Sequence, residues 1–302
     1  MYFIEKLKIH NSLLGRTFYK VNEEPTRMIN SVLDIATSDP KFNLGVVSTY
    51  ARLHKLYQSE SEESLVDKLI QSLQEQRDML SDSELKECYY SIFNFQVRKA
   101  NSGDHQALLQ IVELFKAMTA TGGTGSDNEL NPWIFKNVVL AGLRTQQFDW
   151  VLHTLQVSEP QLPEDYKQNA LAFNYAQVHF YRRDFGRVLE YLQQVEYQDP
   201  AYALNSRNLL VAVYYEIGQI EPLYSTVNSF RTYLKRQTQL SDRIRTGYRD
   251  LLNVTLKLAK AQPQDAKALA QIRTFLEETP TTISRQWLQA KLEELQAGKR
   301  AW

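Results

Sequence analysis

The sequence contains one cysteine, Cys88, and few of the residues that form turns. A single cysteine forms no internal disulfide, which excludes a disulfide-stabilised secreted scaffold. Glycine occurs 11 times and proline 9 times in 302 residues, below their average shares of about 7% and 5%. A chain so poor in turn formers has little room for many strands and hairpins.

Long hydrophobic runs and an excess of one charge are also missing. No run of 18 apolar residues occurs, so the sequence predicts no membrane span. Basic and acidic residues number 35 each, giving a net charge of zero, whereas nucleic-acid-binding proteins are usually basic. Glu5, Lys6 and Lys8 interrupt the apolar stretch that a signal peptide needs. We therefore expect a cytoplasmic protein without membrane association, and the charge balance argues against nucleic acid as its main partner.

Motifs that carry chemistry are scarce. The five histidines lack metal-ligand spacing, and Cys88 lies on an apolar helical face, which is typical of a small buried residue. The glycine-rich TGGTGS at 121–126 lacks the GK[ST] of a phosphate-binding loop. The adjacent glutamates at 62–63 and 277–278 fall on polar helical faces. We predict no catalytic residue, no cofactor and no metal site, and hence a protein that is not an enzyme.

Apolar residues recur at three- and four-residue spacing in almost every segment, as in Leu65, Leu69 and Leu73. This periodicity predicts about fourteen helices of roughly 12 to 20 residues, covering about 70–80% of the chain. Pairs such as Ser81-Asp82 and Asp199-Pro200 punctuate the pattern and are typical of helix starts. The segment 121–131, TGGTGSDNELN, breaks the rhythm and predicts a flexible loop.

An internal repeat emerges when Phe148, Phe185 and Ile220 are aligned, with periods of 37 and 35 residues. Each lies in a short turn between two predicted helices. Small or branched apolar residues occupy the same slots in each copy: Val139, Ala176 and Val211 nine residues earlier, and Val151, Val188 and Leu223 three residues later. A weaker copy around His105 lies 43 residues upstream of the first, and the glycine-rich loop accounts for the longer offset.

The repeat resembles the tetratricopeptide repeat (TPR), a helical hairpin of about 34 residues. The best copy, 169–200, has Ala176, Phe185, Leu192 and Pro200 in the small, aromatic, large and proline slots of the family, but lacks the early Trp. The chain from about residue 41 also resembles an uncharacterised bacterial family of TPR-like proteins, in LNPWIFKNVVLAGLRTQQFDWV, FYRRDFGRVLEYLQQVEYQDPAY and SRQWLQAKLEEL. That family brings no known activity with it.

The resemblance implies an all-α fold in which antiparallel helix pairs stack into one continuous right-handed superhelix with a concave groove. It divides the chain into an N-terminal helical cap (1–40), degenerate helical repeats (41–120), the glycine-rich loop (121–131), TPR-like repeats (132–240) and a C-terminal helical cap (241–302).

The first helix of each TPR-like pair lines the groove. The resemblance places these residues there: Trp133, Lys136, Leu140, Arg144, Phe173, Gln177, Phe180, Tyr181, Asn205, Asn208, Ala212 and Tyr215. We expect Tyr181 and Tyr215 to anchor a partner polypeptide, with Lys136 and Arg144 steering its acidic groups. Gln177 and Ala212 occupy the asparagine slots of the clamp found in chaperone-binding TPR domains, which argues against capture of a free C-terminal carboxylate.

Charge is distributed unevenly, because residues 58–87 carry nine acids and three bases, whereas residues 231–260 carry eight bases and two acids. The basic stretch is consistent with an ordinary solvated face, an acidic protein partner or a single-stranded nucleic acid. We predict a non-catalytic scaffold that binds a protein or peptide. The alternatives are a peptide-sensing regulatory domain, or an RNA-binding helical repeat that uses the basic stretch. The sequence gives no indication of the partner's identity or of the oligomeric state.

Overall fold

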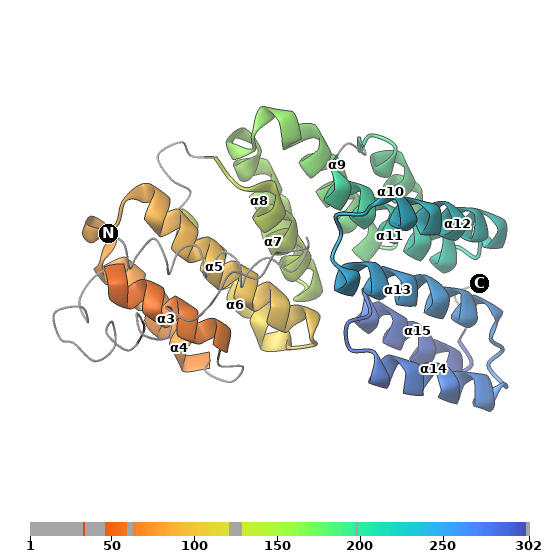
Figure 1. The fold of residues 1–302 in the computed structure, drawn as a ribbon. Helices are drawn as coiled ribbons and strands as arrows, with labels where there is room; N and C mark the ends of the chain where they lie inside the picture. Colours follow the sequence, from red (N-terminus) through yellow and green to blue (C-terminus); the bar gives the residue numbers. More distant parts are fainter. Residues whose placement is uncertain (1–32, 34–45, 59–62, 121–128, 197–198, 300–302) are drawn as a thin grey trace. The chain divides into compact units, whose positions relative to one another are not determined.

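The computed structural model describes Leu33 and residues 46–58, 63–120, 129–196 and 199–299. In these residues the chain forms thirteen α-helices, α3 to α15, two short 3-10 helices and no strand (Figure 1). The all-α prediction is therefore confirmed for the described part of the chain. Residues 121–128 of the glycine-rich loop, and all of the expected N-terminal cap at 1–40 except Leu33, lie outside the described residues.

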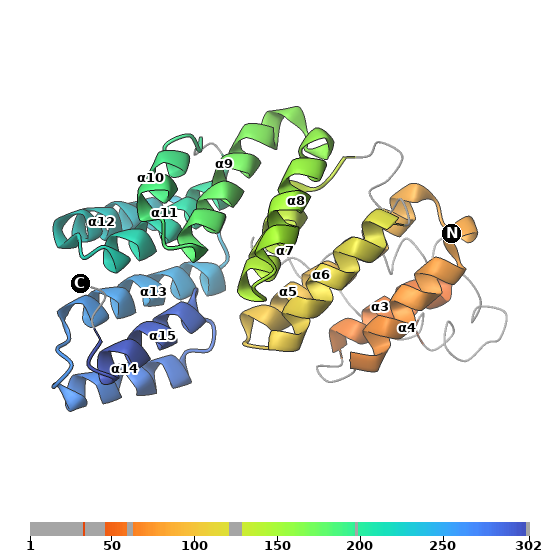
Figure 2. The same ribbon diagram turned by 180° about the vertical axis from the view of Figure 1, so that it is seen from behind.

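The first of two compact units ends at Glu164 and contains six helices of the described chain. These are α3 (Val46–Gln58), α4 (Glu63–Glu75), α5 (Asp82–Asn101), α6 (His105–Ala120), α7 (Pro132–Arg144) and α8 (Phe148–Ser158), with 3-10 helices at Arg77–Met79 and Glu159–Gln161. Each helix packs against the next along the chain, and Figure 2 shows this succession from behind. The order of contacts is that of consecutive hairpins.

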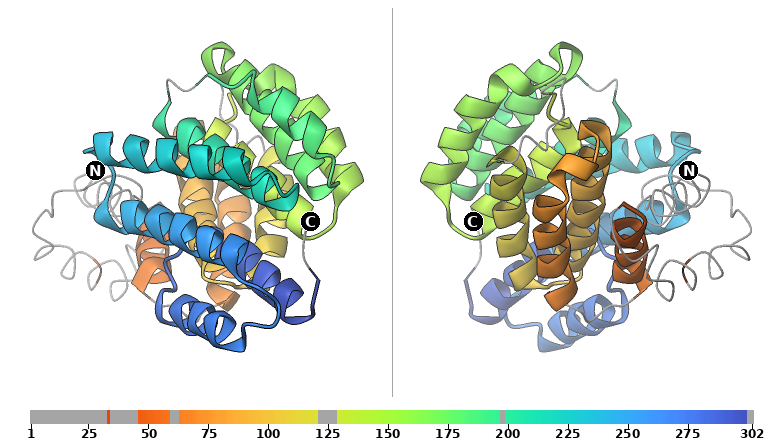
Figure 3. Two further views of the ribbon diagram at one scale, coloured as in Figure 1. Left: turned by 90° about the vertical axis from the view of Figure 1, so that its right-hand side faces the viewer. Right: turned by 90° about the vertical axis from the view of Figure 1, so that its left-hand side faces the viewer.

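The second unit begins at Asp165 and contains seven helices of the described chain. These are α9 (Glu164–Tyr181), α10 (Phe185–Leu192), α11 (Pro200–Glu216), α12 (Ile220–Arg236), α13 (Asp242–Lys260), α14 (Ala266–Glu278) and α15 (Arg285–Gln296). Helices α12 and α13 lie side by side (Figure 3), and α14 and α15 pack below α13 (Figures 1 and 2). Helices α11 to α15 share one core, whose largest side chains are Tyr215, Phe230 and Tyr248.

Helix starts follow the capping residues of the sequence. Ser81 forms a capping box with Glu84, in which the Ser81 hydroxyl accepts from the Glu84 N–H at 3.3 Å. Asp199 accepts from the N–H groups of Ala201 and Tyr202 at 2.7 and 3.2 Å, and Pro200 follows at the first helical position. The punctuation of the sequence thus fixes where α5 and α11 begin.

Four turns that join consecutive helices share one backbone geometry. A residue with positive φ lies two positions before the second helix of each hairpin. These residues are Gly103 (107°), Gln146 (61°), Arg183 (59°) and Gly218 (68°). The next N–H donates to the carbonyl five residues back, in the pairs Asp104–Lys99 (3.1 Å), Gln147–Gly142 (2.8 Å), Asp184–His179 (2.9 Å) and Gln219–Tyr214 (3.0 Å). This Schellman arrangement satisfies carbonyls at the end of the first helix and reverses the chain.

The repeat found in the sequence coincides with these turns. The four aligned residues are each the first residue of a helix: His105 of α6, Phe148 of α8, Phe185 of α10 and Ile220 of α12. The small or branched apolar slots are fully buried: Val139, Ala176, Val211, Val151, Val188 and Leu223 are all 0% exposed. The offsets of 43, 37 and 35 residues therefore separate copies of one hairpin turn.

Gly142 permits the close approach of α7 and α8. A Cβ at this position would lie 2.5 Å from Cγ2 of Val151 and 2.9 Å from the ring of Trp150. We expect Gly142→Ala to lower the free energy of unfolding by about 1–3 kcal/mol through overpacking. Gly186, also helical, has no atom within 4 Å of the corresponding Cβ, so Gly186→Ala should stabilise by about 0.5–1 kcal/mol. Urea unfolding of both variants measures this, and equal effects would contradict the packing described here.

Candidate functional site

The groove residues expected in the first unit lie on α7. Trp133, Lys136 and Arg144 are all half-buried. Desolvation lowers the pKa of Lys136 to about 8, so its ammonium group is less favoured than that of an exposed lysine. This helix therefore offers cations that are only partly exposed.

The groove residues expected on α9, in the second unit, differ widely in exposure. Phe173 is 4% exposed and packs edge-on against Tyr202 of α11, with ring centroids 5.9 Å apart. Gln177 is 6% exposed and donates to the side chain of Asn174 at 3.0 Å. Phe180 is half-buried, and Tyr181 is 37% exposed. Phe173 and Gln177 thus belong to the packing between helices, and Tyr181 is the most exposed of these four.

Of the groove residues expected on α11, Asn208 and Tyr215 contact the region of α15, and Asn205 bonds within its own helix. Asn205 donates to the carbonyl of Ala201 in its own helix at 2.8 Å. The amide of Asn208 donates to the hydroxyl of Ser284, at the start of α15, at 3.0 Å. Tyr215 is 2% exposed and packs edge-on against Trp287 of α15, with ring centroids 5.4 Å apart. The expectation of an exposed anchor at Tyr215 is wrong for this structure, because α15 covers it.

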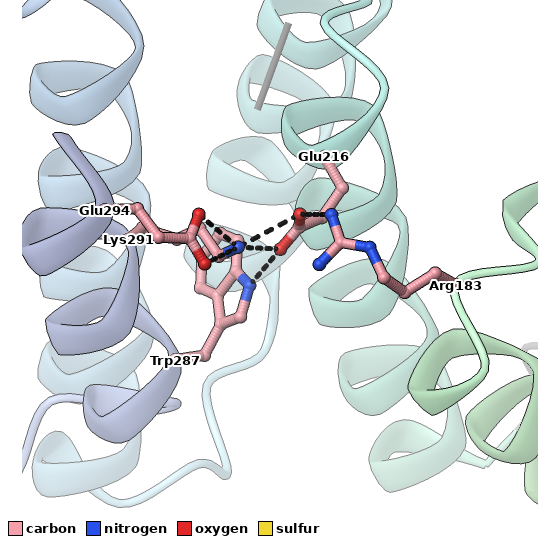
Figure 4. A network of polar contacts seen from close by, with 5 residues as sticks. All are labelled: Arg183, Glu216, Trp287, Lys291 and Glu294. Atoms are coloured by element: carbon pink, nitrogen blue, oxygen red, sulfur yellow. Dashed lines mark hydrogen bonds and ion pairs between the residues drawn. The ribbon is translucent and has the colours of Figure 1, made fainter. Parts of the chain in front are cut away.

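A polar network around Glu216 links three parts of this second unit: α11, α15 and the α9–α10 turn. The Glu216 carboxylate accepts from three side chains: the Lys291 ammonium at 2.8 Å and the Trp287 indole N–H at 2.9 Å, both on α15, and the Arg183 guanidinium at 3.3 Å (Figure 4). Lys291 also pairs with Glu294 at 2.8 Å. The side chains of Glu216 and Lys291 are only 4% and 5% exposed. The buried Glu216–Lys291 pair is therefore flanked by a base and an acid at the surface, since the side chains of Arg183 and Glu294 are 63% and 39% exposed.

Glu216 occupies the same repeat position as two residues of the expected groove, Arg144 and Tyr181, because each is the last residue of the first helix of its hairpin. Glu216 lies four residues before Ile220, as Arg144 lies before Phe148 and Tyr181 before Phe185. Tyr215 lies five residues before Ile220, in the slot of Leu143, which is 1% exposed. Counting back from the aligned turn residue would have identified Glu216 from the sequence. Its partners on α15 are about 75 residues away, and no sequence pattern indicated them.

The network has the properties of a structural ion pair. A buried carboxylate needs donors because its desolvation is costly, and Lys291, Trp287 and Arg183 supply them. No group of three His, Cys, Asp or Glu side chains in the described residues is arranged to hold a metal ion. None of the helices that the structure describes combines the length and the apolar character that a bilayer crossing requires. The hydrogen bonds and ion pairs of Glu216 join α15 to α11 and to the α9–α10 turn.

Comparison with known proteins adds no relative. The chain matches no protein-family model, and no curated protein or solved structure is significantly similar to it.

The Glu216–Lys291 pair gives a sharp test of the network. We expect Lys291→Met to destabilise by about 3–5 kcal/mol, because it leaves a buried carboxylate with its main counter-charge removed. The double variant Glu216→Gln/Lys291→Met should recover most of this loss, since a neutral amide still accepts from Trp287.

The exposed pair Arg187–Glu190, at 60% and 63% side-chain exposure, provides the control. Arg187→Met should change stability by less than about 1 kcal/mol. Chemical denaturation followed by circular dichroism measures all three variants. A Lys291→Met chain as stable as the Arg187→Met chain would show that the network does not hold α15 in place.

Proposed function

We propose that the chain is a non-catalytic scaffold that binds a partner polypeptide, and that its hairpins stack as a right-handed, TPR-like superhelix. The observation that carries the proposal is the repeated turn, with its positive φ two residues before α6, α8, α10 and α12. One helical hairpin cannot bury its apolar face alone, so similar hairpins stack on their neighbours. Stacks of this kind expose long surfaces that suit extended or helical polypeptides.

In the second unit, the end of α9 best suits contact with a partner. Tyr181 is 37% exposed, and Phe180 beside it packs edge-on against Tyr181 and Phe185, with centroids 6.1 and 5.8 Å apart. Partly exposed aromatic side chains on a rigid helix are typical anchors, because few rotamers are lost on binding. Helix α11 contributes less, since α15 covers Asn208 and Tyr215.

In the first unit, Lys136 and Arg144 of α7 would supply positive charge for acidic groups of the partner. Both are half-buried, and Lys136 has a pKa lowered by desolvation. A carboxylate brought next to Lys136 would favour its charged form, so binding there should strengthen as the lysine protonates. This assignment is part of the same proposal.

Substitution of two tyrosines distinguishes a side chain that binds a partner from one that packs in the core. We expect Tyr181→Ala to leave the melting temperature nearly unchanged and to weaken partner capture by about 2 kcal/mol. Tyr215→Ala should destabilise by about 3–5 kcal/mol, because truncation leaves a cavity under Trp287. Thermal melts and quantitative capture of partners from native lysate measure the two effects.

Tyr181→Phe is the matched control, because it keeps the ring and should retain most of the captured partner. The proposal fails if Tyr181→Ala captures the same proteins in the same amounts as the native chain. It also fails if Tyr181→Ala lowers the melting temperature as much as Tyr215→Ala does.

A further inference from the structure

The basic stretch at 231–260 is left with little internal compensation. Within the described residues, Arg245 is the only one of its eight bases in an ion pair, with Asp242 at 3.2 Å. The other acid of the stretch, Asp250, is 8% exposed. Desolvation raises the pKa of Asp250, against a smaller opposing effect of the Arg249 charge. The positive charge of this stretch therefore remains available at the surface.

Helices α12 and α13 lie side by side (Figure 3), and four cations belong to the faces by which they meet. We call this line the α12–α13 seam and define it by Arg231 and Lys235 of α12 and Arg249 and Lys260 of α13. Arg231 is half-buried, and the other three are exposed. No carboxylate of the described chain forms an ion pair with any of the four.

Two contacts fix the register of the seam. The guanidinium of Arg231 donates to the side-chain oxygen of Asn253 at 2.8 Å. The ammonium of Lys260 lies 5.7 Å from the ring centroid of Tyr224. In antiparallel helices, a step forward along one helix matches a step back along the other. One turn beyond the Arg231–Asn253 contact, Lys235 is therefore level with Arg249.

On this register the charges of Lys235 and Arg249 lie at the same level of two neighbouring helices, which is unfavourable in the isolated chain. Like charges at neighbouring positions repel, and salt screens the repulsion only in part. A ligand that brings negative charge between them would remove this cost and gain from both cations. An anionic partner would therefore reduce the electrostatic repulsion between the cations of the seam.

The aromatic ring on the seam bears on the kind of anionic partner. The ammonium of Lys260 lies over the ring of Tyr224, 5.7 Å from its centroid. Single-stranded nucleic acids gain much of their affinity from bases stacked on aromatic faces. Rings already engaged by cations are poor platforms for this, which favours carboxylates over nucleotides.

We infer that the α12–α13 seam binds an acidic polypeptide segment in extended conformation, with carboxylates at alternate residues. Lys235 with Arg249, and Arg231 with Asn253, form two successive levels of the seam, four residues apart along each helix, a rise of about 6 Å. Alternate residues of an extended chain are spaced by about 6.6 Å. A segment with glutamate or aspartate at every second position therefore brings one carboxylate to each of these two cationic levels.

The test uses the full chain and a fluorescent twelve-residue peptide of alternating glutamate and serine. We expect binding by fluorescence anisotropy at about 50 mM salt, and weaker binding at about 300 mM. Lys235→Glu/Arg249→Glu should weaken binding at least about tenfold. Lys267→Glu/Lys299→Glu changes net charge equally at exposed positions outside the seam and should stay within about threefold of the native chain.

Two further ligands and one milder variant complete the test. A peptide with the same six glutamates in one block should bind more weakly than the alternating peptide, and a uridine oligonucleotide should also bind more weakly at equal salt. Lys235→Gln/Arg249→Gln should give intermediate affinity, which guards against misfolding of the charge-reversed chain. Equal losses in the two glutamate double variants, or tighter binding of the oligonucleotide, would overturn the inference.

Discussion

The left-handed residue in each hairpin turn is the constraint on which the described architecture depends. At Gly103, Gln146, Arg183 and Gly218 the backbone adopts positive φ, and the following N–H bonds a carbonyl of the first helix. The geometry ends one helix and starts the next within three residues. Because the turn is set by backbone hydrogen bonds, it tolerates glutamine and arginine as well as glycine. Sequences as different as NSGDH and YRRDF therefore form the same hairpin.

Glu216 is the last residue of α11, the first helix of the fourth such hairpin. In the second unit this side chain bonds to other parts of the chain, because Lys291 and Trp287 of α15 and Arg183 of the α9–α10 turn converge on its carboxylate. A buried ion pair contributes little net stability over an apolar contact, but its loss on one side is costly. The network therefore acts mainly to specify where α15 docks. The surfaces that we propose for partners are the end of α9 and the α12–α13 seam.

Most of the described fold was predictable from the sequence, and part of the candidate site was not. Helix starts followed local capping chemistry, and the 37- and 35-residue periods located the turns, because both depend on neighbouring residues. The exposure of Tyr215 was predicted wrongly, since its burial depends on Trp287, 72 residues further along the chain. Local periodicity carries no information on such a contact. The charge of the basic stretch was visible in sequence, whereas the alignment of Lys235 with Arg249 required the helix register.

The central claim is that backbone geometry, and not the side chain, defines each turn, and adjacent glutamines in the α7–α8 turn test it most directly. Gln146 has a φ of 61° and is exposed, whereas Gln147 has a φ of −88° and donates to Thr145 at 3.0 Å. Relief of left-handed strain is worth about 1–2 kcal/mol, so Gln146→Gly should be as stable as the native chain or more so. Gln147→Gly should lose about 0.5–1 kcal/mol through backbone entropy and the lost bond. Urea titration measures the free energy of unfolding of each variant. An equal loss in both variants would contradict the account.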